Sequence, residues 1–172
     1  AGEPGMSFKL SARSRARLIG VHPRLIEVVE NCIADTPVDF VVIEGVRTKE
    51  RQAELVKSGA SQTMNSRHLV GQDGYAHAVD LAAWVGEVRW DMGLYYQIAA
   101  TVQKVSRYTG VPIRWGGCWL RLDTATKTPA QLVAEYVASR RLAASPILPS
   151  VNQNPVNTIT LMIIAAIRTG VS

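Results

Sequence analysis

Histidine and aspartate side chains near the middle of the chain have the types and spacing of metal ligands. Of the three histidines in the sequence, His68 and His77 lie in or beside a polar segment at 60–76, and Asp80 follows it. A hydrolytic zinc site needs about three protein ligands of the His, Asp or Glu type, with one position left for water. On one regular strand His77 and Asp80 would face opposite sides, so the loop position favours His68 as the partner of Asp80. The same spacing also fits two surface histidines and an aspartate that caps a turn.

Alternating helices and strands are expected to position these side chains. Apolar residues of one helix recur at i, i+3, i+4, i+7 and i+8, which predicts one buried face made of Leu25, Val28, Val29, Cys32 and Ile33. Short apolar runs predict strands at 39–44, 78–84 and 111–115. Caps and periodicity predict helices at 11–20, 23–33, 48–57, 91–108 and 128–141. This order indicates an α+β fold, and we expect a single domain with a small central antiparallel sheet flanked by helices.

Length and composition describe one ordered, basic domain. The chain has 172 residues, of which 47% are hydrophobic, enough for a core of its own. Its net charge of +5 favours anionic partners such as nucleic acid, a membrane surface or a bacterial wall. Cys32 and Cys118 are too few for a disulfide framework. Residues 1–20 lack the apolar run of a signal peptide, so we expect a protein of the cytoplasm.

The composition changes near residue 144. Residues 145–158 contain three prolines and three asparagines, and residues 159–167 are almost wholly apolar. We therefore divide the chain into a domain at 6–144 and an atypical tail at 145–172. The tail is either a linker with a helix docked on the domain or a segment that contacts a membrane or a partner.

Several segments of the chain carry a resemblance to a known family. They are Met6–Ser11, Glu44–Thr48 with Gln52 following, Ser66-x-His68 with Ala78-x-Asp80, and Ile113–Trp119. In this order they resemble the zinc motifs and flanking segments of D-alanyl-D-alanine carboxypeptidases and L-alanyl-D-glutamate endopeptidases, which cut the stem peptides of peptidoglycan. The phage endolysins among these enzymes resemble the chain most, over about residues 6–141. One departure is Cys118, which stands where an acidic residue is commoner in the family.

The resemblance implies roles for individual residues. His68 and Asp80 would be zinc ligands, with Zn²⁺ as the cofactor. Arg47 would stabilise the oxyanion formed when the scissile amide is attacked, and a fixed guanidinium at such a place contributes on the order of 3–4 kcal/mol. Without the resemblance, an exposed Arg47 that pairs with Glu50 would be the simpler interpretation. Ser66 either orients the loop or contacts substrate, and its competing interpretation is an ordinary turn residue.

The third zinc ligand of the family is missing from the sequence. In the family it is a histidine within a Pro-His-Phe-Glu-like strand, with an acidic general base close by, whereas no histidine follows His77 here. Either another residue supplies the third ligand, or the site is incomplete. The candidates to replace it are His22, His77, Cys118, Asp123 and Glu135. Asp123 is also the leading candidate for the general base, with a solvated loop carboxylate as the competing interpretation.

The function expected from these features is that of a zinc-dependent peptidoglycan peptidase, similar to endolysins, which hydrolyses L-alanyl-D-glutamate bonds or, less favoured, D-alanyl-D-alanine bonds. The alternative is a non-catalytic cell-wall-binding relative with an incomplete zinc site. Expected partners are peptidoglycan stem peptides and an anionic wall or outer-membrane surface, and we expect a monomer. Arg13, Arg15 and Arg17 would suit nucleic acid, but no base-reading motif accompanies them, so nucleic acid is not expected. Such an enzyme would stay in the host cytoplasm until lysis and then act at the cell wall or in the periplasm.

Overall fold

The computed structural model describes residues 7–143 and 159–163, and it has the predicted α+β architecture. Its helices are α1 (Ala12–Arg17), α2 (Pro23–Asp35), α3 (Lys49–Lys57), α4 (Met92–Thr109) and α5 (Pro129–Ala143). Its strands are β1 (Phe40–Glu44), β2 (Ala78–Trp84), β3 (Val88–Arg89), β4 (Ile113–Trp115), β5 (Leu120–Arg121) and β6 (Ile159–Ile163). All the predicted helices and strands are present, within a few residues of their expected bounds.

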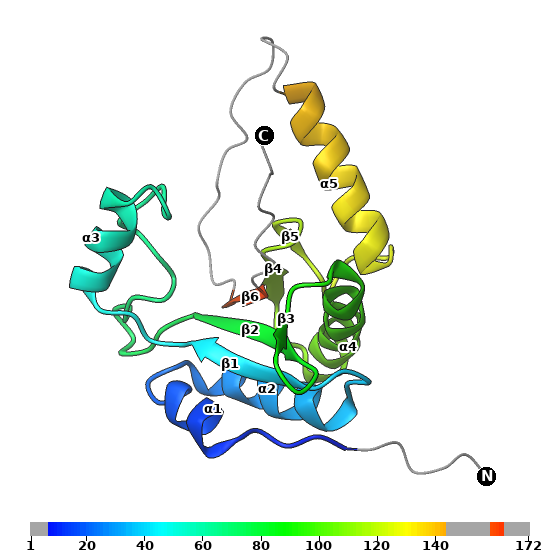
Figure 1. Cartoon of the computed structure of the whole chain (residues 1–172), viewed down its shortest axis with the longest axis horizontal. Helices are drawn as coiled ribbons and strands as arrows, with labels where there is room; N and C mark the ends of the chain where they lie inside the picture. Colours follow the sequence, from blue (N-terminus) through cyan, green and yellow to red (C-terminus); the bar gives the residue numbers. More distant parts are fainter. Residues whose placement is uncertain (1–6, 144–158, 164–172) are drawn as a thin grey trace.

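The strands form one sheet in the order β1-β2-β6-β4-β5, with β3 paired to β2 (Figure 1). The pairs β1–β2, β2–β3 and β4–β5 are antiparallel, as expected for the small central sheet. β6 lies between β2 and β4 and runs parallel to both. This part of the tail is therefore a strand, whereas the sequence left a docked helix as one alternative. A short apolar run fits a buried strand as well as a buried helix, so its periodicity does not separate the two.

The main core lies between the sheet and the helices α2 and α4, which pack on each other (Figure 1). Every residue predicted for the buried face of α2 is buried. α4 adds Ile98, Val102 and Val105, and the sheet adds Val42 and Leu81. Each fully buried aliphatic side chain contributes about 1.5–3 kcal/mol relative to an exposed one. The packing of α2 and α4 on the sheet therefore contributes to the free energy of unfolding.

A bulge near the end of β1 decides which face carries its last residue. Val42 pairs with Leu81, and after a register irregularity Glu44 pairs with Asp80. Cross-strand partners project on the same face of a sheet, and neighbouring residues of a strand project on opposite faces. Glu44 and Asp80 therefore share the face opposite the core, on the two strands that residues 45–77 connect.

The polar segment at 60–76 is a long connection without a helix or a strand, as predicted. Its end is anchored to the chain between α1 and α2, because Ala76 N donates to Gly20 O and His22 N donates to Ala76 O, each at 2.9 Å. None of the helices in the described part of the chain is both long and apolar enough to cross a membrane.

Hydrogen bonds hold α1 against β1 at the edge of the sheet, and the two segments approach closely at Gly45. Arg17 Nη1 donates to the Val42 carbonyl at 2.7 Å, and Val42 N donates to Ser14 Oγ at 3.1 Å. A Cβ on Gly45 would lie 2.1 Å from the Arg17 carbonyl oxygen, far inside contact distance. Only glycine fits this contact without movement of the backbone.

Gly45→Ala should therefore lower the free energy of unfolding by about 1–3 kcal/mol, because α1 or β1 must shift to admit the methyl group. Gly93→Ala is the matched control, since a Cβ there meets no atom within 4 Å and the residue is helical. That control should be neutral or stabilise the protein by up to about 1 kcal/mol. Urea unfolding measures both variants, and equal stabilities would contradict the packing at Gly45.

Candidate metal centre

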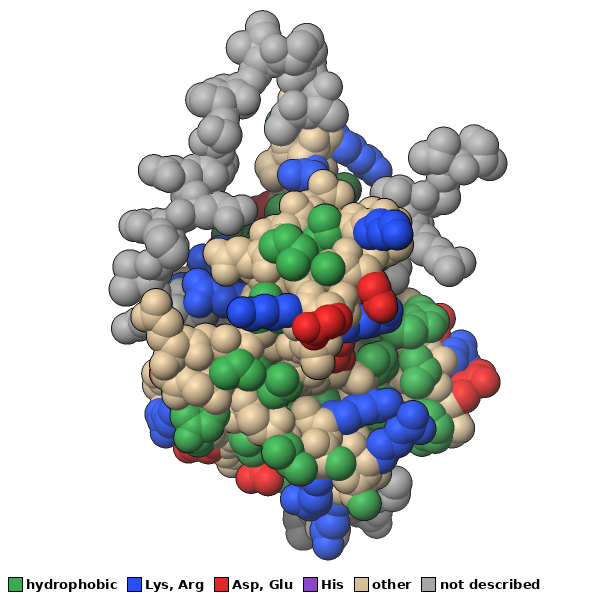
Figure 2. All heavy atoms as spheres, turned by 90° about the vertical axis from the view of Figure 1, so that its left-hand side faces the viewer, with side chains coloured by type: hydrophobic (Ala, Val, Ile, Leu, Met, Phe, Trp, Pro, Cys, Tyr) green, Lys and Arg blue, Asp and Glu red, His purple; other side chains and the backbone are tan. Residues whose placement is uncertain are grey.

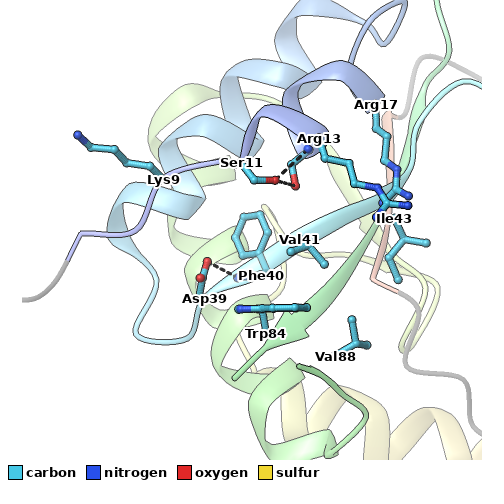
Figure 3. Close-up of a pocket in the computed structure, with 11 residues that line it drawn as sticks. Lys9, Ser11, Arg13, Arg17, Asp39, Phe40, Val41, Ile43, Trp84 and Val88 are labelled. Carbon is cyan, nitrogen blue, oxygen red and sulfur yellow. Dashed lines mark hydrogen bonds between the residues drawn. The ribbon is translucent and has the colours of Figure 1, made fainter. Parts of the chain in front are cut away.

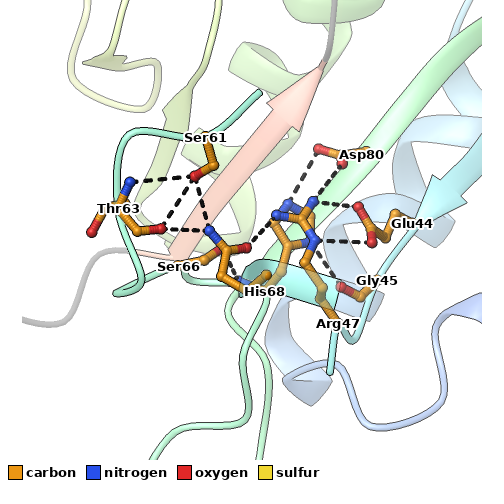
Figure 4. A network of polar contacts seen from close by, with 9 residues as sticks. Glu44, Gly45, Arg47, Ser61, Thr63, Ser66, His68 and Asp80 are labelled. Carbon is orange, nitrogen blue, oxygen red and sulfur yellow. Dashed lines mark hydrogen bonds and ion pairs between the residues drawn. The ribbon is translucent and has the colours of Figure 1, made fainter. Parts of the chain in front are cut away.

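His68 is held in one orientation by the backbone around it (Figure 4). Its imidazole is buried, and Nδ1 lies 2.7 Å from the Gly45 carbonyl oxygen. A carbonyl can only accept, so Nδ1 donates a proton to it and Nε2 is the ring nitrogen that faces Asp80. The backbone of His68 is fixed as well, because its oxygen accepts from Arg47 N at 2.8 Å and its N–H donates to Ser66 Oγ at 3.2 Å.

Two buried polar atoms face each other at this nitrogen. His68 Nε2 lies 3.3 Å from Asp80 Oδ1, and within the described residues neither atom has a hydrogen-bond partner. The Asp80 side chain is 1% exposed, and this burial raises the pKa of its carboxyl above the ordinary value. An unsatisfied buried polar group costs about 1–3 kcal/mol. A cation between the two atoms would satisfy both, and imidazole and carboxylate are ligands that zinc takes, so these residues fit a metal ion.

Glu44 is the residue that sequence reasoning missed. One ligand atom each from Glu44, His68 and Asp80 lies within 4.8 Å of the others, and the described residues contain no second group of this kind. We call these three residues the candidate metal centre. Burial alone would raise the pKa of the Glu44 carboxyl, but hydrogen bonds and charge from Arg47 hold it below the ordinary value. Glu44 therefore stays ionised, as a cation ligand must.

Arg47 lies beside the candidate metal centre and binds Glu44, where the simpler interpretation of the sequence had Glu50. Its Nε donates to one Glu44 oxygen at 2.9 Å, and its Nη2 donates to the other. Nη2 is also 3.7 Å from Asp80 Oδ2. The hydrogen bond to Glu44 raises the pKa of Arg47 above its ordinary value. A fixed positive charge thus lies next to the three acceptors, and its role at an oxyanion stays a prediction.

Gln52 anchors Arg47 from the opposite side. Arg47 Nη1 donates to Gln52 Oε1 at 2.8 Å. The Gln52 amide nitrogen donates in turn to Ser61 Oγ at 2.9 Å and to the Thr63 carbonyl at 2.6 Å. Gln52 belongs to α3 and is fully buried. A continuous polar network, drawn in Figure 4, therefore connects α3 and the long loop to the carboxylate at the end of β1.

Ser66 shapes the turn that presents His68. Its Oγ accepts from His68 N, and its carbonyl accepts from Leu69 N at 3.1 Å. These bonds agree with a role in orienting the loop. Contact between Ser66 and a substrate stays a prediction.

The histidines considered as replacement ligands have other partners. His77 Nε2 lies 2.7 Å from Asp73 Oδ2. His22 caps the start of α2, because its Nδ1 accepts from Arg24 N at 3.2 Å. Their rings are near each other, with centroids 5.0 Å apart, but neither residue belongs to the candidate metal centre.

The remaining candidates also lie outside the candidate metal centre. Cys118 is buried, and this burial raises the pKa of its thiol. Asp123, the leading candidate for the general base, forms an ion pair with Arg121, and Glu135 forms one with Lys127. None of these three side chains therefore contributes a ligand atom to the candidate metal centre.

Comparison with known proteins gives the same family that the motifs indicated. Residues 6–130 match the family model described as phage L-alanyl-D-glutamate peptidase. The L-alanyl-D-glutamate peptidase of Escherichia phage T5 is 27% identical over 119 residues, which cover 66% of this chain and 83% of that protein. The L-alanyl-D-glutamate peptidase of Listeria phage A118 is 39% identical over 83 residues, which cover 48% of this chain and 27% of that protein.

A solved structure shares the fold. The crystal structure of Serratia marcescens L-Ala D-Glu endopeptidase ChiX matches with a TM-score of 0.60 and 38% sequence identity, over 72% of this chain and 86% of that one. The match to the family ends at residue 130, so it includes the candidate metal centre and Arg47 but not the tail. The chain belongs to the phage L-alanyl-D-glutamate peptidase family.

Proposed function

We propose that this protein is a zinc-dependent peptidoglycan hydrolase that cuts the L-alanyl-D-glutamate bond of stem peptides and acts at the bacterial wall during phage lysis. The observation that carries the proposal is that two buried atoms, His68 Nε2 and Asp80 Oδ1, lie 3.3 Å apart. Neither atom has a hydrogen-bond partner in the described part of the chain. Membership of the family supports the substrate class. The names of the relatives favour this bond over the D-alanyl-D-alanine bond.

His68, Asp80 and Glu44 would hold the ion. When bound, zinc supplies a Lewis acid and lowers the pKa of a coordinated water towards ~7. The Gly45 carbonyl keeps the proton of His68 on Nδ1, which leaves Nε2 free as a ligand atom. A carboxylate oxygen of Glu44 lies within 4.8 Å of the ligand atoms of His68 and Asp80, and we therefore assign Glu44 as the third ligand.

Arg47 would stabilise the negative charge that develops on the scissile carbonyl oxygen. Glu44 and Gln52 hold its guanidinium in place, so little reorganisation is needed when that charge forms. A guanidinium has more N–H groups than these two partners use, which leaves donors for the substrate.

The non-catalytic alternative depends on one fact of the sequence, that no histidine follows His77. A wall-binding protein with an incomplete site would hold zinc below stoichiometry and would release no amino groups from purified peptidoglycan. Stoichiometric zinc together with released amino groups would exclude it.

Zinc should stabilise the fold. With free zinc at about 100 times its Kd, the free energy of unfolding should rise by about 2.7 kcal/mol and Tm should rise with it. Asp80→Asn should abolish this gain, and in EDTA it should be at least as stable as the wild type, because it removes a charge whose burial is costly. Asp35→Asn, at an exposed carboxylate, is the control that should keep the gain. A wild-type Tm that does not respond to zinc would contradict the site.

Glu44→Gln should weaken zinc binding by more than about tenfold, because an amide oxygen is a poorer ligand than an ionised carboxylate. Competition with a chromophoric chelator measures the affinity. Glu54→Gln, at an exposed glutamate of α3, should leave the affinity unchanged. If Glu44→Gln kept full zinc affinity and lost only turnover, Glu44 would be a base and the assignment as a ligand would be wrong.

Arg47→Lys should lower kcat by about 10²–10³-fold at saturating zinc, because an ammonium cannot keep the contacts of the guanidinium and also face the oxyanion. Release of amino groups from isolated sacculi measures kcat. Arg51→Lys, on the exposed face of α3, is the matched control and should retain wild-type activity. Wild-type kcat in Arg47→Lys would remove Arg47 from the mechanism.

A further inference from the structure

A groove of about 450 Å³ lies between α1, β1 and the end of β2 (Figure 3). Lys9, Arg13 and Arg17 line one side, and Trp84 lines the other. Apolar side chains of β1, including Ile43, lie between the two sides. We call this feature the α1–β1 groove. None of its lining residues has a role in the proposed hydrolysis.

Within residues 7–143, the positive charges of the α1–β1 groove have no carboxylate partner. Among the described residues no Asp or Glu oxygen lies within 4.0 Å of Lys9, Arg13 or Arg17, whereas other arginines, such as Arg15, form ion pairs. Asp39 is the one acid that lines the groove, and its Oδ1 accepts from the backbone N–H of the next residue at 2.8 Å. Basic side chains occur at several places on the face shown in Figure 2, so only their position and fixed orientation can distinguish those of the groove.

Arg17 and Trp84 give the groove preorganised walls. Arg17 Nη1 donates to the Val42 carbonyl at 2.7 Å, which fixes the guanidinium and leaves its other donors free. Arg13 is one helical turn before Arg17 on α1, so the two residues lie on the same side of the helix. Trp84 is 39% exposed, and its backbone N donates to Asp39 O at 2.8 Å, which holds it beside β1. Cations on one side of the groove and an aromatic ring on the other suit an extended acidic peptide.

One end of the α1–β1 groove lies next to the candidate metal centre along β1. Its lining includes Arg17 and Ile43, and Ile43 immediately precedes Glu44. The carbonyl of Arg17 packs against Gly45, whose own carbonyl accepts from His68. A substrate cut at the metal centre would therefore extend into the groove on one side of the scissile bond.

We propose that the α1–β1 groove binds the acidic half of the stem peptide, the part that begins with D-glutamate, through Lys9, Arg13 and Arg17. This inference rests on the proposed function. D-glutamate uses one carboxyl to join the next residue and keeps the other as a free carboxylate, and the peptide ends in a further carboxylate. The half of the stem on the L-alanine side offers no such charges, so the charge of the groove selects the direction in which the peptide lies.

The kinetic test compares two soluble tetrapeptides, L-Ala-D-Glu-L-Lys-D-Ala with free carboxylates and the same peptide with both carboxylates amidated. The double variant Lys9→Gln/Arg13→Gln should raise KM for the acidic peptide about 5–10-fold with little change in kcat, as expected for the loss of two exposed ion pairs. It should change KM for the amidated peptide much less. Arg17 is left in place because it holds Val42.

Arg140→Gln/Arg141→Gln is the matched control, since it removes the same charge from exposed positions in α5. It should leave KM for both peptides unchanged. An equal rise of KM in the control would overturn the proposal, because net charge alone would then explain the effect. Equal KM values of the wild-type protein for the two peptides would overturn it as well.

A binding test separates the groove from the proposed activity. Calorimetry with the tripeptide D-Glu-L-Lys-D-Ala at low ionic strength should give a Kd that rises about 5–10-fold in Lys9→Gln/Arg13→Gln and rises also in Trp84→Ala. Binding with this dependence but without cleavage of either tetrapeptide would support the groove and refute the peptidase. Cleavage with no such dependence would refute the groove alone. A DNA duplex that binds as tightly and loses affinity in the same variants would also refute it, because the site would then accept any polyanion.

Discussion

The site depends on one interaction, the close approach of a buried imidazole nitrogen and a buried carboxylate oxygen. The Gly45 carbonyl accepts from Nδ1 of His68, so Nε2 is directed at Asp80 Oδ1, 3.3 Å away. A positive charge between these two atoms, either a proton on the imidazole or a metal cation, stabilises the buried carboxylate. The metal binding that we propose would therefore be linked to folding, because an ion bound here would stabilise the buried carboxylate and imidazole.

The pairing of β1 with β2 makes this close approach possible. Because side chains alternate along a strand, a register shift of one residue would turn Asp80 into the apolar core. The bulge before Glu44 places that residue on the same face as Asp80. Gly45 then makes two contacts with its backbone, one with α1 and one with His68. Contacts that stabilise the fold and residues of the candidate metal centre thus lie together at the end of one short strand.

The sequence predicted the parts of the site that depend on residue type and order. The spacing and the resemblance identified His68 and Asp80, and the structure brings their side chains together. Glu44 was missed because its position depends on cross-strand register and on a bulge, which local patterns do not encode. A signal was nevertheless present, since Glu44 ends one predicted strand and the next predicted strand contains Asp80. The partner of Arg47 was missed for a similar reason: Arg47 precedes α3, so helical spacing to Glu50 does not describe its surroundings.

The secondary structure was predictable where periodicity is strong, as in α2 and α4. β3 and β5 have two residues each and leave no pattern of their own. β6 pairs in parallel with strands that are distant in sequence, and an apolar run alone does not specify such a pairing. The assignment of the tail as a separate region stays a prediction, although one segment of it completes the sheet.

The most direct test of the central claim is a crystal structure of the full chain grown with zinc, with diffraction data collected on both sides of the zinc absorption edge. The account predicts an anomalous peak between His68 and Asp80, at about 2.0–2.2 Å from Nε2 and from a carboxylate oxygen, with Glu44 as the next ligand. An anomalous map without a peak at these side chains, in crystals whose His68 and Asp80 still face each other, would contradict it.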